Sequence, residues 1–186
     1  WWSAVCGATR KVITQAEIQP EEIAGVGIDG QSWSAIAIDK EGKVLTNTPI
    51  WMDTRAQSIC DRLNQEIGEE KIFEIAGNSL QPSYTTAKIL WYRENLPEVY
   101  KNICKILQSN SYIAYRLTDA ITQDVSQGYG IHCFNMKTGK WDSEMCRLLG
   151  IPESFLPEKI CACDEIVGTV TAKAAAETGL VEGIPV

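Results

Sequence analysis

Trp51, Asp53 and Arg55 form the densest group of chemically capable side chains in the sequence. An indole packs on the C–H faces of a polyol, while a carboxylate accepts and a guanidinium donates hydrogen bonds to its hydroxyl groups. The three residue types at this spacing therefore indicate recognition of a polyhydroxylated ligand. The alternative is a helix N-terminus, in which Asp53 or Thr54 caps the helix and Arg55 pairs with a nearby acid. Taken alone, the motif favours this capping interpretation, because such residues are common at helix starts.

Gly25–Gly30 matches the dinucleotide-binding pattern G-x-G-x-x-G. That pattern requires the glycines to lie between a strand and the helix whose N-terminus faces the pyrophosphate. Here extended, Ala- and Ile-rich chain follows, and no acidic residue stands about 20 positions further on in the right context. A second interpretation makes residues 27–32 a phosphate loop of the actin and sugar-kinase type. This phosphate-loop interpretation is placed second, because the large Trp33 stands where the backbone of such a loop would have to approach the phosphate closely.

Other candidate groups favour structural roles. The polar loop 124–130 resembles an ordinary turn, and His132, set between apolar neighbours, is predicted to be a hydrogen-bonded strand residue rather than a catalytic base. With a single histidine, no G-x-S-x-G elbow and no G-x-x-x-x-G-K-[ST] loop, a Ser/His/Asp hydrolase and a P-loop enzyme find no support. Cys161 and Cys163 are the only close pair of cysteines, and they lack the partners of a zinc site. We predict no metal ligand set.

The elements that must position these residues alternate between helix and strand. Helical periodicity covers residues 1–16, and a helical turn at 20–23 leads into β-like chain. Two short strands, a turn at 40–42 and extended residues from 44 to 51 predict a small antiparallel ribbon. Further helices are predicted at 54–67, 69–76, 85–94, 97–103, 112–117, 143–149 and 171–179, and strands at 26–28, 34–38, 103–107, 130–136, 165–170 and 184–186. Such alternation is typical of an α/β domain.

Composition limits the partners and the compartment. The 186 residues are 45% hydrophobic and include six Trp, which predicts one packed domain. A net charge of −7 argues against nucleic acid or an anionic membrane surface as partner, and no stretch approaches the roughly 20 apolar residues of a membrane span. Seven scattered cysteines indicate a reducing, cytoplasmic location. The start at Trp1, without Met, and the strand-like end Gly183–Val186 lead us to expect a cut at both ends.

Taken in order, several segments resemble the N-terminal domain of the FGGY family of carbohydrate kinases, most closely its xylulose-kinase-like members. The collinear order is more specific than any one motif, and it extends over essentially the whole chain. The segments are Ile23–Gln31, Asp39–Gly42, Pro49–Ala56, Ala87–Trp91, Tyr115–Thr118 followed by Asp124, Gly139–Asp142, and Ile166–Gly168.

The resemblance implies an α/β fold of the actin-like ATPase and ribonuclease-H-like type, with a mixed sheet flanked by helices. Residues 1–186 would be an incomplete, sugar-binding N-terminal domain, with the phosphate hairpin upstream and the C-terminal ATP-binding domain downstream. The implied reaction is transfer of the γ-phosphate of ATP, with Mg²⁺, to a sugar hydroxyl group. The catalytic base, an Asp, is expected just after Val186, so we place no catalytic residue in this chain and expect the piece alone to be inactive.

The resemblance also assigns the sugar-binding positions. They are Gln31, Ser32, Trp33, Trp51, Asp53, Arg55 and, from a loop that aligns less closely, Ser83. Xylulose kinases usually carry His where Trp33 stands, which leaves ribulose, rhamnulose, fuculose or another polyol open beside xylulose. A small-molecule sugar is the expected partner, and a homodimer is left open. One rival is a non-catalytic sugar-binding or regulatory module of the same fold. Another is an NAD-dependent oxidoreductase, in which Gly25–Gly30 would open a helix.

Overall fold

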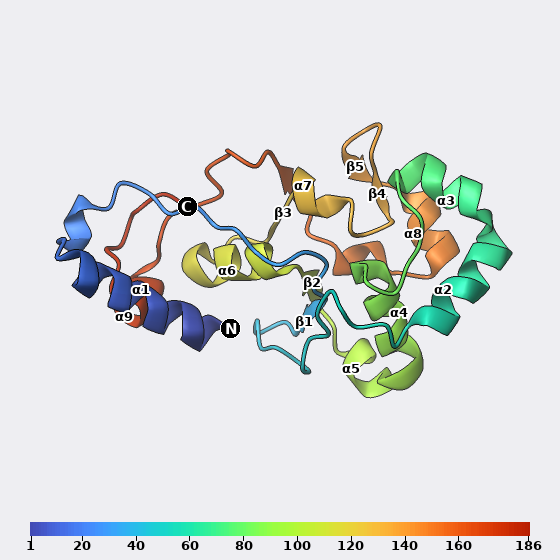
Figure 1. Ribbon diagram of the computed structural model, residues 1–186, viewed down its shortest axis with the longest axis horizontal. Helices are drawn as coiled ribbons and strands as arrows, with labels where there is room; N and C mark the ends of the chain where they lie inside the picture. The colour runs from blue at the N-terminus through green and yellow to red at the C-terminus, as the bar shows by residue number, and fades with distance from the viewer. The chain divides into compact units, whose positions relative to one another are not determined.

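The computed structural model describes residues 1–186, which group into two compact units. Unit 1 consists of Trp1–Gly30, Asn110–Thr122 and Asp164–Val186, and unit 2 consists of Gln31–Ser109 and Gln123–Cys163. Each unit is assembled from segments far apart in the sequence (Figure 1). All the predicted sugar-binding positions fall in unit 2.

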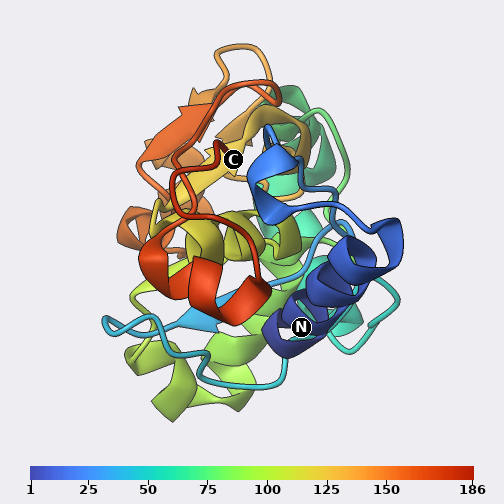
Figure 2. The same ribbon diagram turned by 90° about the vertical axis from the view of Figure 1, so that its left-hand side faces the viewer.

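Unit 1 is built around helix α1 (Trp2–Ala16), which confirms the predicted first helix. α9 (Ala172–Thr178) packs against α1, and Figure 2 shows the two helices, dark blue and red, side by side. The guanidinium of Arg116, from α6 (Ser109–Thr118), lies 4.5 Å from the Trp2 ring and 3.2 Å from the Glu177 carboxylate. An aromatic ring and one ion pair thus join three helices.

The glycine-rich segment of unit 1 follows η1 (Pro20–Glu22), a single 3₁₀ turn, and is extended. The Val26 N–H donates to the carbonyl of Pro185 at 2.9 Å, and Thr169 forms an isolated antiparallel bridge with Pro185. The strands predicted at 26–28, 165–170 and 184–186 are therefore extended chain without a continuous ladder. Residues 167–170 and 183–186 are nevertheless joined by four backbone hydrogen bonds beside the bridge. Because no helix follows Gly30, the dinucleotide-binding interpretation is wrong.

The core of unit 2 lies around an antiparallel pair of strands, β1 (Ile36–Ile38) and β2 (Lys105–Leu107), in which Ala37 faces Ile106. Both residues are fully buried. α2 runs through a π-helical turn, η2, into α3. The helices of this part are α2 (Gln57–Leu63), η2 (Asn64–Gly68), α3 (Glu69–Ala76), α4 (Thr85–Asn95) and α5 (Pro97–Lys101).

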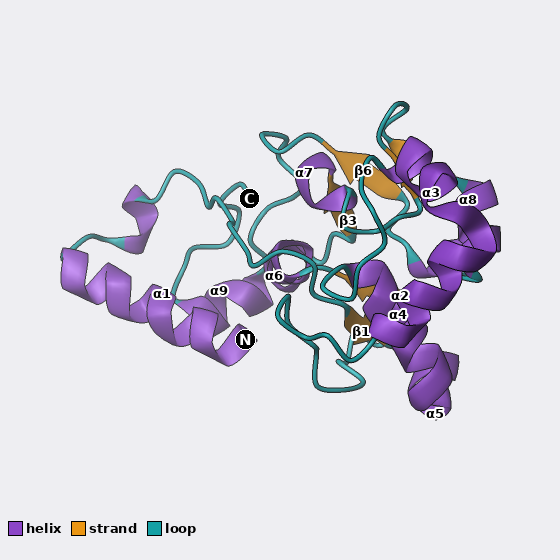
Figure 3. Ribbon diagram, turned by 45° about the vertical axis from the view of Figure 1, so that its right-hand side comes forward, coloured by secondary structure: helices purple, strands orange, loops and turns teal.

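The remaining elements of the chain are short. β3 (Thr122–Asp124) pairs with β6 (Lys159–Cys161), a strand that the sequence did not predict, and β4 (Phe134–Asn135) pairs antiparallel with β5 (Lys140–Trp141). The helical pieces are α7 (Val125–Gly128), α8 (Ser143–Leu149) and η3 (Glu153–Phe155). The predicted α/β class is confirmed, and the strands form three two-stranded sheets among helices and long loops (Figure 3).

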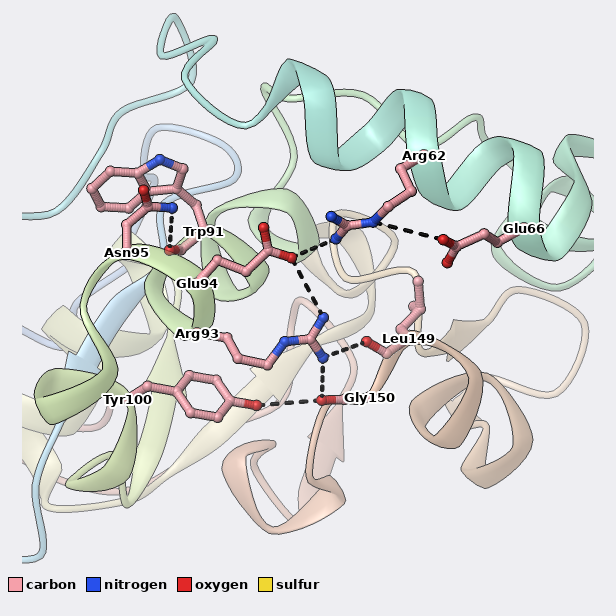
Figure 4. A network of polar contacts seen from close by, with 9 residues as sticks. All are labelled: Arg62, Glu66, Trp91, Arg93, Glu94, Asn95, Tyr100, Leu149 and Gly150. Atoms are coloured by element: carbon pink, nitrogen blue, oxygen red, sulfur yellow. Dashed lines mark hydrogen bonds and ion pairs between the residues drawn. The ribbon is translucent and has the colours of Figure 1, made fainter.

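A polar network fastens α8 to the helices that precede it (Figure 4). The Arg93 guanidinium of α4 donates to the carbonyls of Leu149 and Gly150 at 3.1 and 3.0 Å, and it lies beside the Glu94 carboxylate. The last carbonyls of a helix lack partners within that helix, so this cation satisfies the end of α8. Arg62 of α2 pairs with Glu94 and so extends the network to a third helix. No helix in residues 1–186 has the length and apolar character needed to cross a bilayer.

Candidate sugar-binding site

The loop at residues 31–33 leads directly into β1 and is held by side chains from elsewhere in unit 2. The Ser109 hydroxyl donates to the carbonyl of Gln31 at 2.6 Å, and the Gln127 side-chain amide donates to the Ser32 hydroxyl at 3.4 Å. The backbone of Trp33 has a φ of 65°, in the left-handed region that L residues rarely adopt. The three residues are half-buried, so the loop is positioned by the fold and still reaches solvent.

The indole of Trp33 packs in an aromatic cluster with two tyrosine rings. Its centroid lies 4.4 Å from that of Tyr84 and 6.0 Å from that of Tyr129, and its Nε1 is buried with no hydrogen-bond partner. Gly130 lies directly beneath the ring, where an added Cβ would come within 2.3 Å of the Trp33 Cδ1. The cluster gives this site an apolar wall of the kind that packs on the C–H face of a sugar.

Lys88 joins two of the predicted sugar-binding segments. Its ammonium donates to the carbonyl of Trp33 at 2.9 Å and to the carbonyl of Ser83, and only 1% of the residue is exposed. Burial lowers the pKa of Lys88 to about 8, although the Asp53 carboxylate acts in the opposite direction. Lys88 is not among the residues predicted for the site. The available signal was a lysine inside the apolar run 87–91 of a predicted helix, a position where a cation needs buried partners.

Asp53 and Arg55 bind each other. The Asp53 carboxylate accepts from the backbone N–H of Arg55 at 3.0 Å and from its Nε at 2.8 Å, and the Arg55 guanidinium lies 4.6 Å from the Trp91 ring centroid. Burial raises the pKa of Asp53, but the hydrogen bonds from Arg55 and the charge of Lys88 outweigh it and hold this pKa below its usual range.

The helix cap predicted at Asp53 or Thr54 is wrong, whereas the predicted pairing of Arg55 with a nearby acid is confirmed. α2 begins at Gln57, its N-cap is Ala56, and no side chain caps it. Asp53 is instead used in the turn that precedes the helix, together with Arg55. Both residues also line an open hollow of about 460 Å³, whose other walls are Thr46, Asn47, Thr48, Pro49, Ile50, Trp91 and Leu96.

The predicted positions thus fall into three groups in unit 2. Trp33 and Ser83 meet at Lys88, with Gln31 and Ser32 on the same loop as Trp33. Asp53 and Arg55 form the second group. Trp51 stands alone as a side chain with 49% of its surface exposed. Sequence reasoning missed Tyr84, Tyr129 and Gly130 because their proximity to Trp33 arises only from tertiary folding.

His132 is buried and serves the structure, as predicted, although it lies in a turn rather than a strand. Its Nδ1 lies 3.0 Å from the Thr86 hydroxyl, and its Nε2 lies 3.2 Å from the carbonyl of Ser79. The carbonyl can only accept, so this network assigns the proton to Nε2. Burial lowers the pKa of His132 to about 4, which keeps the ring neutral at physiological pH.

We expect His132 to make the protein acid-sensitive. The folded-state pKa of about 4 lies below the ordinary value of 6.5, so between these pH values the unfolded chain binds more protons and folding stability falls as the pH falls. The full shift corresponds to about 3 kcal/mol. Unfolding midpoints of the full-length protein from pH 7 to 4 test this. His132→Gln should be less stable at pH 7 yet lose less stability on acidification, and equal acid-dependent losses would contradict the assignment.

The comparisons with known proteins cover the whole chain. The model of the FGGY family of carbohydrate kinases, N-terminal domain, matches residues 1–186. A probable L-xylulose kinase of Haemophilus influenzae is 33% identical over 187 residues, covering 100% of this chain and 38% of its own length. A xylulose kinase of Bacillus subtilis is 27% identical over 182 residues, covering 98% of this chain and 36% of its own. The crystal structure of xylulose kinase from Rhodospirillum rubrum superposes with a TM-score of 0.91 at 26% identity, covering 100% and 38%.

The chain therefore belongs to the FGGY family of carbohydrate kinases and has the actin-like α/β fold of that family. The predicted family is thereby confirmed, and the relatives that match are named as xylulose kinases. The chain spans a little over a third of the length of these relatives.

Proposed function

We propose that the full-length protein containing this chain transfers the γ-phosphate of ATP to a hydroxyl group of a ketopentose such as xylulose, and that unit 2 supplies much of the sugar-binding side. The observation that carries this proposal is the convergence of the Trp33 loop and the Ser83 loop on the Lys88 ammonium. Two segments proposed for sugar binding, 50 residues apart in the sequence, thereby lie at one place. The names of the relatives support the choice of sugar.

In this proposal each group has a distinct role. The aromatic cluster around Trp33 packs on the carbon face of the sugar, while Gln31, Ser32 and Ser83 offer hydrogen bonds to its hydroxyl groups. Asp53 and Arg55 offer further hydrogen bonds from the second loop, and the exposed Trp51 ring of that loop offers a separate apolar face. Holding the acceptor hydroxyl in line with the phosphate is the main contribution that a kinase makes to the rate.

The nucleotide is assigned to parts of the full-length protein outside residues 1–186. Gly25–Gly30 is extended chain and presents no helix N-terminus to a phosphate group, so the segment does not fit such a ligand. When bound, ATP with Mg²⁺ supplies the phosphoryl group and the cation that offsets its charge. A cytoplasmic location and a homodimer stay predictions.

A substrate panel tests the proposed reaction. The full-length protein is incubated with ATP, Mg²⁺ and each of a set of ketopentoses, ketohexoses and polyols, and ADP release is measured beside sugar-induced thermal shift. We expect the largest kcat/KM with a ketopentose. A thermal shift without phosphorylation of any sugar would favour the non-catalytic sugar-binding module. If no sugar gave either ADP release or a thermal shift, both functions would be contradicted.

Asp53→Ala and Trp51→Ala should affect sugar and nucleotide unequally. Removing a charged hydrogen-bonding group costs about 1.5–3 kcal/mol, so we expect the sugar KM of Asp53→Ala to rise at least tenfold while the KM for ATP stays within about twofold. Trp51→Ala should show the same direction with a smaller effect, because the ring is already half exposed. Steady-state kinetics in both substrates provide the measurement. Activity losses that only parallel a loss of thermal stability would show that the two residues are structural.

A further inference from the structure

We propose that Lys88 is a positioning residue of the sugar site, because its buried ammonium binds the main-chain carbonyls of both the Trp33 loop and the Ser83 loop. This inference rests on the function proposed above and extends it to a residue that contacts no sugar. Lys88 would act through Trp33, by holding that residue in the orientation in which its ring meets the substrate.

The contacts of α4 with residues 33–35 support this role. Thr85 donates to the carbonyl of Ser34 at 3.3 Å, Lys88 to that of Trp33 at 2.9 Å, and Tyr92 to that of Ala35 at 2.8 Å. The three donors stand at helix positions i, i+3 and i+7, and therefore lie on one face of α4. One helix face thus binds three successive carbonyls of the chain that connects the Trp33 loop to β1.

Lys88 differs from Thr85 and Tyr92 in its further hydrogen-bond partner. Its ammonium also binds the carbonyl of Ser83. The titratable groups that act on it are Cys60 and the Asp53 carboxylate, and the latter acts on Tyr92 as well. Trp33 needs such support, since its φ of 65° is unfavourable for a residue with a Cβ. A buried cation with two carbonyl partners is a strong and directional constraint on the loop.

The test compares variants of the full-length protein that remove different parts of this arrangement. Lys88→Met keeps the volume of the side chain and removes every donor, whereas Lys88→Arg keeps donors and charge. Tyr92→Phe removes a carbonyl bond on the same helix face and leaves the Lys88 bonds to Trp33 and Ser83 in place. Lys101→Met replaces an exposed lysine of α5 and serves as the matched control.

The expected result is a loss of kcat/KM for the sugar without a matching change in the KM for ATP. For Lys88→Met we expect kcat/KM for the sugar to fall about a hundredfold, as misplacement of a binding group by about 1 Å can do, and the KM for ATP to stay within about twofold. Lys88→Arg should retain part of the activity. Tyr92→Phe should lower the unfolding midpoint with little change in sugar KM, and Lys101→Met should change neither.

Several outcomes would overturn the inference. A folded Lys88→Met protein with the sugar KM and sugar-induced thermal shift of the wild type would show that Lys88 is structural only. If Lys88→Met does not fold, Lys88→Gln, which keeps two N–H donors without the charge, is measured in its place by the same criteria. Failure of the proposed function is distinguishable, because the wild type would then neither bind nor phosphorylate any sugar of the panel.

Discussion

Gly130→Ala is expected to displace the Trp33 ring and to weaken both folding and sugar use. The new Cβ would come within 2.3 Å of the Trp33 Cδ1 and 3.3 Å of the Gln127 carbonyl oxygen. The ring cannot tilt freely, because Tyr84 and Tyr129 contact it. Overpacking of this kind costs about 1–3 kcal/mol of stability. We further expect kcat/KM for the sugar to fall at least tenfold, since the wall of the site would shift.

A double-mutant cycle isolates this steric effect. In a Trp33→Ala background the clash with the indole is absent and only the 3.3 Å approach to the Gln127 carbonyl oxygen remains, so Gly130→Ala should change stability there by less than about 0.5 kcal/mol. Gly27→Ala is the matched control, because a Cβ at that glycine meets nothing within 4 Å. Urea unfolding of the four proteins of the cycle, with sugar kinetics on the folded ones, provides the measurements. An equal cost of Gly130→Ala in both backgrounds would contradict the arrangement of Trp33 over Gly130.

Helices with strong local signals were predictable from the sequence. The prediction for residues 143–149 coincides with α8, because Asp142 caps its N-terminus by accepting from the Met145 N–H, and Gly150, with a φ of 66°, ends it. Both interactions are local and depend on residue types that the sequence displays. The first helix was predictable for a similar reason, namely its periodic apolar positions.

The strands were harder to predict, because their pairing depends on residues distant in the sequence. β1 finds its partner β2 about 70 residues further along, and each has only three residues in the ladder. At 26–28 the apolar pattern indicated a strand, yet that segment makes one hydrogen bond to Pro185 and no ladder. Burial and pairing at such positions are decided by tertiary packing rather than by local propensity.

The segments that form the candidate site were predictable, but the side-chain contacts between those segments were not. Family resemblance indicated the loops of Trp33, Asp53 and Ser83, whereas the bonds by which the Lys88 ammonium joins the Trp33 and Ser83 loops are visible only in three dimensions. For Asp53 the residue types suggested a helix cap, but the pairing with Arg55 competes for the same carboxylate oxygens. A side chain with several possible partners cannot be assigned to one of them from spacing alone.

Ile106→Ala is expected to destabilise unit 2 strongly. Ile106 is fully buried in β2 opposite Ala37, and truncating a buried Ile to Ala costs about 2–5 kcal/mol through lost burial and the cavity that remains. The neighbouring Gln108 donates to the carbonyl of Gln127, so the loss should reach the segment that supports Ser32. Ile106→Val removes one methyl group and should cost about 0.5–1.5 kcal/mol.

Urea unfolding of the full-length protein measures this series, with Ile166→Ala as the control. Ile166 is 64% exposed, so its truncation should change stability by less than about 0.5 kcal/mol. The cost should increase in the order Ile166→Ala, Ile106→Val, Ile106→Ala. Below the unfolding transition the sugar KM of Ile106→Val should stay near that of the wild type, because the packing under the Trp33 loop is retained. A cost for Ile106→Ala no greater than that of the control would mean that β1 and β2 do not form the core beneath the site.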